Sequence, residues 1–296
     1  IQKRYRIGQK IRQEGPDLHQ HKMGTPTMGG IIIFFSVALS LLIFHPEDST
    51  IYTSFLMMCS FGLVGLIDDI IKSYKGRSLG LKARNKIFLQ LIVSISFLYW
   101  FFQQGLFDQT IVIPFKSVPL PISPIFYIAL VMLVFLSTTN AVNLTDGLDG
   151  LATGLIMVAL LAFALIAFKE DKKNLTFFAL IITLSCSGFL IFNFHPARIF
   201  LGDVGSLGLG GVLAAIAVFC KAELFLLLIG GIFVLETLSV ITQVLSIQLN
   251  HKPVFLMSPL HHHFEMMKWK EISIVTMFWM FGVLFALLGL FSYPFN

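Results

Sequence analysis

Residues 151–168, LATGLIMVALLAFALIAF, form an unbroken run of 18 residues without a charged side chain. A helix of about 18 to 20 apolar residues is long enough to cross the ~30 Å hydrocarbon core of a bilayer. The whole chain has the same character, because 56% of its 296 residues are hydrophobic and only 12% are charged. Soluble domains carry roughly 25% charged residues. We therefore expect an all-α polytopic membrane protein.

Eight further apolar windows of similar length flank this run, so the sequence predicts nine transmembrane helices. We place the nine at residues 27–44, 51–67, 88–102, 125–142, 151–168, 175–194, 204–219, 222–249 and 272–293. The remainder is too short for a separate soluble domain. Residues 1–296 are therefore expected to form one membrane domain: a juxtamembrane segment (1–26) and a helical bundle (27–293), with an amphipathic cytoplasmic loop (250–271). A soluble enzyme, a nucleic-acid-binding domain and a secreted disulfide scaffold are excluded, and no nucleic-acid partner is expected.

Two of these windows are unusual. Segment 222–249 would be about 42 Å long as one helix, so it must tilt, bend or project from the membrane. It contains Glu236, for which a functional intramembrane carboxylate and a hydrogen-bonded structural one are equally good interpretations. Segment 204–219 is rich in glycine, which favours close helix packing over phosphate binding.

The basic residues are divided unequally between the two sets of connections. Lys and Arg number 6 in 1–26, 6 in 68–87, 1 in 195–203 and 3 in 250–271, whereas the alternate connections hold 5 of the 21. The positive-inside rule therefore places the N-terminal side in the cytoplasm and the C-terminus outside. The same cytoplasmic connections hold seven of the eight histidines, so an active site is expected at this face.

Three carboxylates belong to this face. Asp68 and Asp69 end the second window in LIDDIIK, and Asp203 lies in IFLGDVGS. Asp68 could simply pair with Lys72 one helical turn later, and Asp203 could cap the next helix. Taken together, three hard oxygen ligands at one membrane level suit Mg²⁺ better than zinc. Adjacent helical residues point about 100° apart, so the two neighbouring aspartates are expected to have different roles.

The segment NAVNLTDGLDG places Asn143, Asp146 and Asp149 at intervals of three, with no cation among them. An acid-rich helix N-terminus would explain one aspartate. Amide and carboxylate groups together also suit a nucleotide base, a ribose or a hydrated divalent cation.

The histidine run PLHHHFE contains His261, His262 and His263. Structural zinc prefers spaced ligands with cysteine, so binding of an anionic substrate is the better interpretation. Met266, Met267 and Trp269 beside two lysines are typical of a helix on a bilayer surface.

Five segments in order, GPDLHQHKMGTPTMGG, LIDDIIK, NAVNLTDGLDGLATG, FNFHPARIFLGDVGSL and PLHHHFE, resemble the signatures of the phospho-N-acetylmuramoyl-pentapeptide transferases. These belong to the polyprenyl-phosphate N-acetylhexosamine-1-phosphate transferases. The resemblance runs from about residue 8 to the end, and the triple histidine with GTPTMGG points to the muramoyl branch.

The resemblance implies a Mg²⁺-dependent enzyme of the bacterial plasma membrane. Undecaprenyl phosphate would attack the sugar-linked phosphate of UDP-MurNAc-pentapeptide, giving lipid I and UMP in peptidoglycan synthesis. It also implies a frequent homodimer, a bent ninth helix and ten transmembrane helices. With nine windows and no initial Met, the family's first helix and the native start are expected to be missing here.

Site residues carried over by the resemblance fall into three groups. Asp68, Asp69 and Asp203 would be the essential carboxylates, with Asp203 as the foremost Mg²⁺ ligand. Lys72 would meet the diphosphate, and Lys22 lies in the basic segment beside the membrane. The nucleotide pocket would be lined by Asn143, Asp146, Asp149, Asn193, Phe200 and Gly202, with Phe200 stacked on uracil and His261, His262 and His263 near the sugar or peptide.

Two rival functions have different requirements. A transporter would require several ionisable groups near the bilayer midplane and internal repeats. In this sequence, only Glu236 lies well inside a predicted span, and no repeat is found. A transferase that uses UDP-GlcNAc would share the same carboxylates, so the sequence leaves the choice of sugar nucleotide open.

Overall fold

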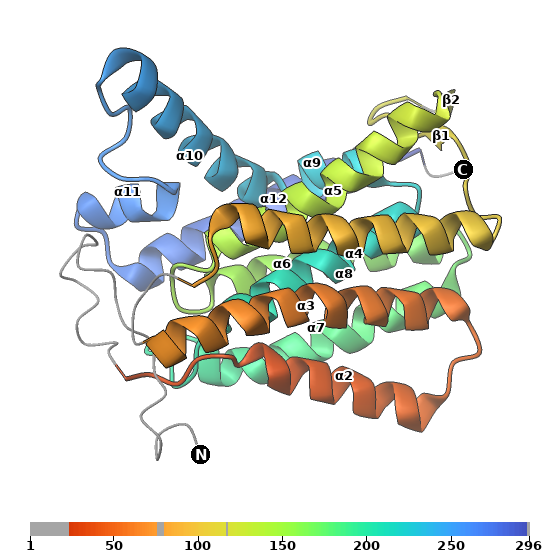
Figure 1. Ribbon diagram of the computed structural model, residues 1–296, viewed down its shortest axis with the longest axis horizontal. Helices are drawn as coiled ribbons and strands as arrows, with labels where there is room; N and C mark the ends of the chain where they lie inside the picture. The colour runs from red at the N-terminus through yellow and green to blue at the C-terminus, as the bar shows by residue number, and fades with distance from the viewer. Residues whose placement is uncertain (1–23, 76–79, 117, 295–296) are drawn as a thin grey trace.

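The computed structural model describes residues 24–75, 80–116 and 118–294, and almost all of its elements are helices packed side by side (Figure 1). In these ranges, eight helices are long and apolar enough to cross a membrane. They are α3 (Ser49–Lys75), α4 (Ala83–Gln103), α5 (Pro124–Thr145), α6 (Leu151–Lys169), α7 (Lys173–Asn193), α8 (Gly202–Phe219), α10 (Gly231–Asn250) and α12 (Glu271–Ser292). The predicted polytopic helical architecture is confirmed.

The predicted first window, 27–44, forms the shorter apolar helix α2 (Gly30–Phe44). Its 15 residues rise about 22 Å at 1.5 Å per residue, less than the hydrocarbon thickness. The count of nine spanning helices therefore depends on α2 and stays a prediction.

The centre of the bundle is α8. Every residue from Val204 to Phe219 is buried, and the helix packs chiefly against α3 and α5. Glycine makes these approaches close enough: a Cβ on Gly210 would lie 2.7 Å from the Thr139 Cα, and one on Gly65 would overlap the backbone of Asp203. The prediction that the glycines of 204–219 serve close packing is confirmed.

The long window 222–249 is not one helix. It contains a 3₁₀ turn, η2 (Glu223–Phe225), and one turn of helix, α9 (Leu226–Ile229), before α10 begins after Gly230. Gly230 is the C-cap of α9, and its backbone N–H donates to the Leu226 carbonyl at 2.9 Å. In Figure 1, α10 then diverges from the bundle and leads to the short helix α11 (Leu260–Met266). The expected bend is thus an interruption at Gly230.

A small β-hairpin lies at one end of the bundle, on the right in Figure 1. Strands β1 (Thr110–Ile111) and β2 (Leu120–Pro121) pair antiparallel in the connection between α4 and α5. Nearby, the Tyr127 hydroxyl donates to the Glu223 carboxylate at 2.8 Å and accepts from Lys221 at 3.0 Å. Burial raises the pKa of Glu223 and lowers that of Lys221.

The predicted functional segments meet at the other end of the bundle, on the left in Figure 1. The end of α3 and the start of α8 lie there, together with the connections between α5 and α6 and between α7 and α8. Helix α11 and the start of α12 lie at the same end. The alternation of helix direction therefore gathers the motifs as the connection pattern predicted.

Candidate active site

Three carboxylates converge where α3 ends and α8 begins. One oxygen from each of Asp68, Asp69 and Asp203 lies within 4.8 Å of the other two. Asp68 and Asp69 are buried, and Asp203 is partly exposed in the first turn of α8. The sequence had placed these carboxylates at one membrane level, and the structure brings them into one cluster.

Lys72 joins the three carboxylates. Its Nζ lies 2.7 Å from Asp68 Oδ2, 2.9 Å from Asp203 Oδ1 and 3.9 Å from Asp69 Oδ1. The simple ion pair between Asp68 and Lys72 is therefore present, but the lysine also links α3 to α8. A lysine in this position offsets the repulsion that three close carboxylates would otherwise feel.

A second lysine, Lys86 in the first turn of α4, was missed by the sequence reasoning. Its Nζ lies 2.7 Å from Asp203 Oδ2 and donates to Asn143 Oδ1 at 2.9 Å. The only signal in the sequence was its position in the basic connection of residues 68–87. Asp203 thus accepts from one lysine on each oxygen, and it does not cap its helix: the N-cap of α8 is Leu201, with no side-chain cap.

The two neighbouring aspartates share Lys72 but accept from different backbone N–H groups. Asp68 Oδ1 accepts from the Leu81 backbone N–H at 2.6 Å, whereas Asp69 Oδ2 accepts from the Val204 N–H at 3.1 Å. Gly202, predicted to line the nucleotide pocket, lies beside Asp69 with a φ of +76°. A Cβ there would be 2.8 Å from Asp69 Oδ2, so both the backbone and the space require glycine.

The segment before α2, residues 26–29, pairs with Phe200 in the segment that leads into α8. The Phe200 N–H donates to the Pro26 carbonyl at 2.8 Å, and the Phe200 carbonyl accepts from Gly29 at 2.8 Å. Phe200 itself is half-buried. This pairing fixes the backbone of Phe200 three residues before Asp203. Its stacking on uracil in the nucleotide pocket stays a prediction.

The last turn of α5 and the connection to α6 hold three of the predicted polar residues. Asn143 accepts from Lys86 and donates to Ser206 at 2.9 Å. Asp146 ends α5, and burial, together with repulsion from Asp203 and Asp69, raises its pKa well above the usual range. Both residues therefore border the carboxylate cluster.

The interpretation of this connection as an acid-capped helix is wrong. The N-cap of α6 is Gly150 with a φ of +76°, and no side chain caps the helix. Asp149 instead accepts from the Ala197 N–H at 3.0 Å. Asp149 also contacts His195 and Glu271, which are distant from it in the sequence.

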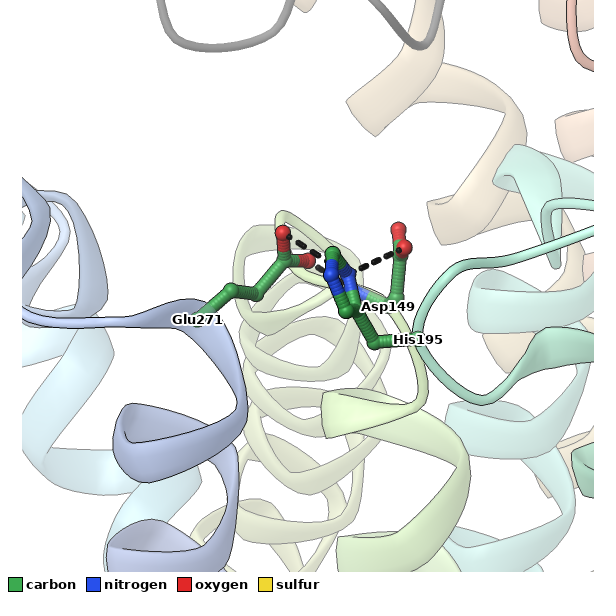
Figure 2. Close-up of side chains that lie close together, drawn as sticks. All are labelled: Asp149, His195 and Glu271. Carbon is green, nitrogen blue, oxygen red and sulfur yellow. Dashed lines mark hydrogen bonds and ion pairs between the residues drawn. The ribbon is translucent and has the colours of Figure 1, made fainter.

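Figure 2 shows Asp149, His195 and Glu271 directed toward one another from three segments. His195 Nδ1 lies 3.1 Å from Asp149 Oδ2 and 3.3 Å from Glu271 Oε2. The second oxygen of Glu271 accepts from the Asp149 N–H at 2.8 Å. The three residues could also offer ligand atoms to a metal, but these hydrogen bonds already account for their arrangement. Neither His195 nor Glu271 was singled out from the sequence.

Asn193 supports a loop from inside the protein. Its side chain is 2% exposed, accepts from the Thr153 hydroxyl at 2.8 Å and donates to the Ile199 carbonyl at 3.0 Å. Both amide atoms are thus used within the chain. The structure places Asn193 beneath the loop that carries Phe200.

The three histidines have separate partners. His261 is buried against Glu236, with 3.2 Å between Nδ1 and Oε1. His262 Nδ1 lies 2.6 Å from Glu265 Oε2, and His263 Nδ1 accepts from the Leu256 N–H at 3.1 Å. The rings of His261 and His262 lie in contact, with 4.2 Å between their centroids, so the expectation that consecutive histidines point in different directions is wrong for this pair. Lys22 lies outside the described residues.

Comparison with known proteins gives a consistent family. Glycosyl transferase family 4 matches residues 50–221. The phospho-N-acetylmuramoyl-pentapeptide-transferase of Oceanobacillus iheyensis is 45% identical over 295 residues, covering 98% of this chain and 90% of the relative. Proteins of the same name from Anoxybacillus flavithermus and Bacillus cytotoxicus are 43% and 44% identical, with the same coverage. The chain therefore belongs to glycosyl transferase family 4 and, within it, to the phospho-N-acetylmuramoyl-pentapeptide transferases.

Proposed function

We propose that this protein transfers phospho-N-acetylmuramoyl-pentapeptide from its UDP derivative to undecaprenyl phosphate, giving lipid I and UMP in peptidoglycan synthesis. The observation that carries the proposal is the cluster of Asp68, Asp69 and Asp203 around Lys72 at one end of a membrane bundle. Relatives whose sequences align with 98% of this chain are named as this transferase.

The location of the cluster suits two substrates of different solubility. The nucleotide donor is water-soluble, whereas the lipid phosphate is held at the bilayer surface by its tail. Their phosphates can meet only near the interface. The proposed orientation places this end of the bundle in the cytoplasm of a bacterium, at the inner face of the plasma membrane.

The donor set fits Mg²⁺ as the cofactor. Carboxylate oxygens are the ligands that Mg²⁺ prefers, and Asp203, with Asp68 and Asp69 beside it, offers three within 4.8 Å. When bound, the ion would neutralise phosphate charge and polarise the phosphoryl oxygens. Lys72 and Lys86 belong to the same electrostatic unit, because both contact Asp203.

The protein's own groups address the main obstacle, which is repulsion between two phosphate anions. Lys72 is 30% exposed and can turn toward the diphosphate, while Lys86 holds Asp203 and Asn143 in place. A phosphate monoester has a second pKa of about 6, so the acceptor is already mostly a dianion at pH 7. The acceptor therefore needs little help from a base.

The nucleotide would bind beside this cluster. Asn143 and Asp146 border it, and Asp149 follows three residues after Asp146. Gly202 leaves the space next to Asp69, and Phe200 would offer a ring for uracil. Asn193 would act by supporting the Phe200 loop. His262, His263 and Lys22 would face the sugar, the peptide or the phosphates. A homodimer is part of the proposal, as in the resemblance.

The test is an assay of UMP release by the purified protein with undecaprenyl phosphate and one donor at a time. We expect turnover with UDP-MurNAc-pentapeptide and a kcat/KM for UDP-GlcNAc at least 100-fold lower. Preference for UDP-GlcNAc would assign the chain to a different reaction of the wider family. No UMP with either donor would contradict the proposal.

A further inference from the structure

Glu236 is a buried carboxylate within α10, with no exposed side-chain surface. Burying a carboxylate is costly unless hydrogen bonds compensate it. Its Oε1 accepts from the backbone N–H of His261 at 3.2 Å and lies 3.2 Å from Nδ1 of the same residue. The carboxylate therefore holds both the backbone and the ring of the first histidine of the run.

The same face of α10 holds the connection that leads to this histidine. Gln243, two turns beyond Glu236, accepts from the Val254 N–H at 3.0 Å and the Phe255 N–H at 2.9 Å, and donates to the Phe255 carbonyl at 3.0 Å. The chain after α10 is thus folded back along the helix. Glu236 completes this arrangement by fixing the first turn of α11.

The contact with Glu236 selects a tautomer for His261. A carboxylate can only accept hydrogen bonds, so the ring proton belongs on Nδ1, and Nε2 keeps its lone pair. Nε2 is buried and has no hydrogen-bond partner among the described residues, and the same is true of Glu236 Oε2. The pair therefore has acceptor capacity that the described part of the protein does not use.

The unused nitrogen faces the nucleotide connection. A Cβ built on Gly147 would overlap His261 Nε2, so the ring lies directly against this glycine. Gly147 adjoins Asp146 and lies two residues before Asp149. The first histidine of the run is thereby in contact with the loop that is proposed to bind the sugar nucleotide.

We propose that Glu236 is a positioning residue for His261. It holds the Nδ1–H tautomer, which keeps the buried Nε2 unprotonated against Gly147, and so fixes the loop of residues 146–150 that is proposed to bind the sugar nucleotide. The inference rests on the proposed function for the identity of the ligand of that loop. The tautomer and the role of Glu236 in setting it can be measured without any substrate.

The kinetic test is a double-mutant cycle with Glu236→Gln, Glu236→Leu and His261→Asn in the full chain. His261→Asn keeps a donor near the Nδ1 position but removes Nε2, and we expect its KM for the UDP donor to rise about 10-fold or more. Glu236→Leu should reach a similar loss in kcat/KM, while Glu236→Gln, which keeps an acceptor, recovers most of it. Glu236→Leu added to His261→Asn should cost less than about 2-fold more, because both act through one nitrogen.

Ser239→Ala is the matched control. Ser239 is buried on the same helix and donates to the Glu236 backbone carbonyl at 2.7 Å, so its removal deletes a hydrogen bond without touching His261. We expect kinetic constants close to those of the parent. UMP binding verifies that each variant is folded.

The second measurement is ¹⁵N NMR of histidine-labelled protein in detergent, with the His261 signals identified by their loss in His261→Asn. We expect a protonated Nδ1 and an unprotonated Nε2 in the parent, and mixed tautomers in Glu236→Gln. A protonated Nε2 in the parent, parent-like kinetics in Glu236→Leu, or multiplicative losses in the cycle would overturn the inference. An inactive parent with the expected tautomer would instead count against the proposed function alone.

Discussion

Asp203 Oδ2 and Lys86 Nζ lie 2.7 Å apart and connect the first turn of α8 to the first turn of α4. The same nitrogen donates to Asn143, so one lysine holds a carboxylate of the aspartate cluster and an amide in the last turn of α5, where the nucleotide is proposed to bind. The two halves of the proposed reaction, phosphate activation and nucleotide binding, therefore share a structural support.

Replacing Lys86 tests this support. Lys86→Met should lower kcat/KM by about 10- to 100-fold, because it leaves one Asp203 oxygen and the Asn143 carbonyl without their donor. Lys86→Arg should recover part of the loss, since it keeps the charge with a different donor geometry. Steady-state UMP release measures the effect. Lys173→Met is the control, because Lys173 is exposed beyond the opposite end; an equal loss there would refute a specific role for Lys86.

Gly202 offers a test of backbone geometry. Gly202→Ala places a Cβ at a φ of +76° and 2.8 Å from Asp69 Oδ2, so we expect nearly complete loss of activity and about 1 to 3 kcal/mol of destabilisation. Thermal unfolding in detergent and UMP release would measure both. Gly188→Ala is the matched control, as a Cβ there meets nothing within 4 Å. Parent-like activity of Gly202→Ala would show that the position tolerates a side chain.

The arrangement in Figure 2 predicts a graded series at His195. His195→Ala removes the group between Asp149 and Glu271, and the KM for the UDP donor should rise several-fold as the loop before α6 loosens. His195→Asn keeps a donor near the Nδ1 position and should retain a KM close to that of the parent. If both variants raise KM equally, the hydrogen bond through Nδ1 is not what positions Asp149.

Glu223 predicts a pH dependence of stability. Burial raises the pKa of Glu223 in the folded state above its value in the unfolded chain. At a pH between the two values, the folded protein binds more protons at this group than the unfolded chain does. The free energy of unfolding therefore falls as the pH rises through this range. Glu223→Gln should therefore be stabilised relative to the parent at pH 8, and this advantage should shrink as pH falls toward 5. Unfolding temperatures of the two proteins across this range give the difference. An advantage that grows as pH falls would reverse the assigned sign.

The sequence was sufficient for features that depend on local patterns. Apolar windows located the helices, and the alternation of connections gathered Asp68, Asp69 and Asp203 at one end. The Asp68 to Lys72 pair followed from helical spacing alone.

Features that depend on packing between distant helices were beyond the sequence. Lys86 was one basic residue among six in its connection, and nothing local showed that it faces Asp203. The histidine of an unremarkable FHPAR segment gave no sign that it lies between Asp149 and Glu271. The contact of Glu236 with His261 depends on the fold-back along α10, which nothing local in the sequence indicated.

The most direct test of the central claim, that the aspartate cluster forms the Mg²⁺-dependent reaction centre, is a Mg²⁺ titration of lipid I formation by the parent and by Asp203→Asn. We predict no turnover in EDTA, recovery with Mg²⁺ or Mn²⁺, and an Asp203→Asn variant that binds UMP but needs far more Mg²⁺ for a small residual rate, up to pH 9. Full turnover in EDTA, or an Asp203→Asn variant with the parent's rate and Mg²⁺ dependence, would contradict it.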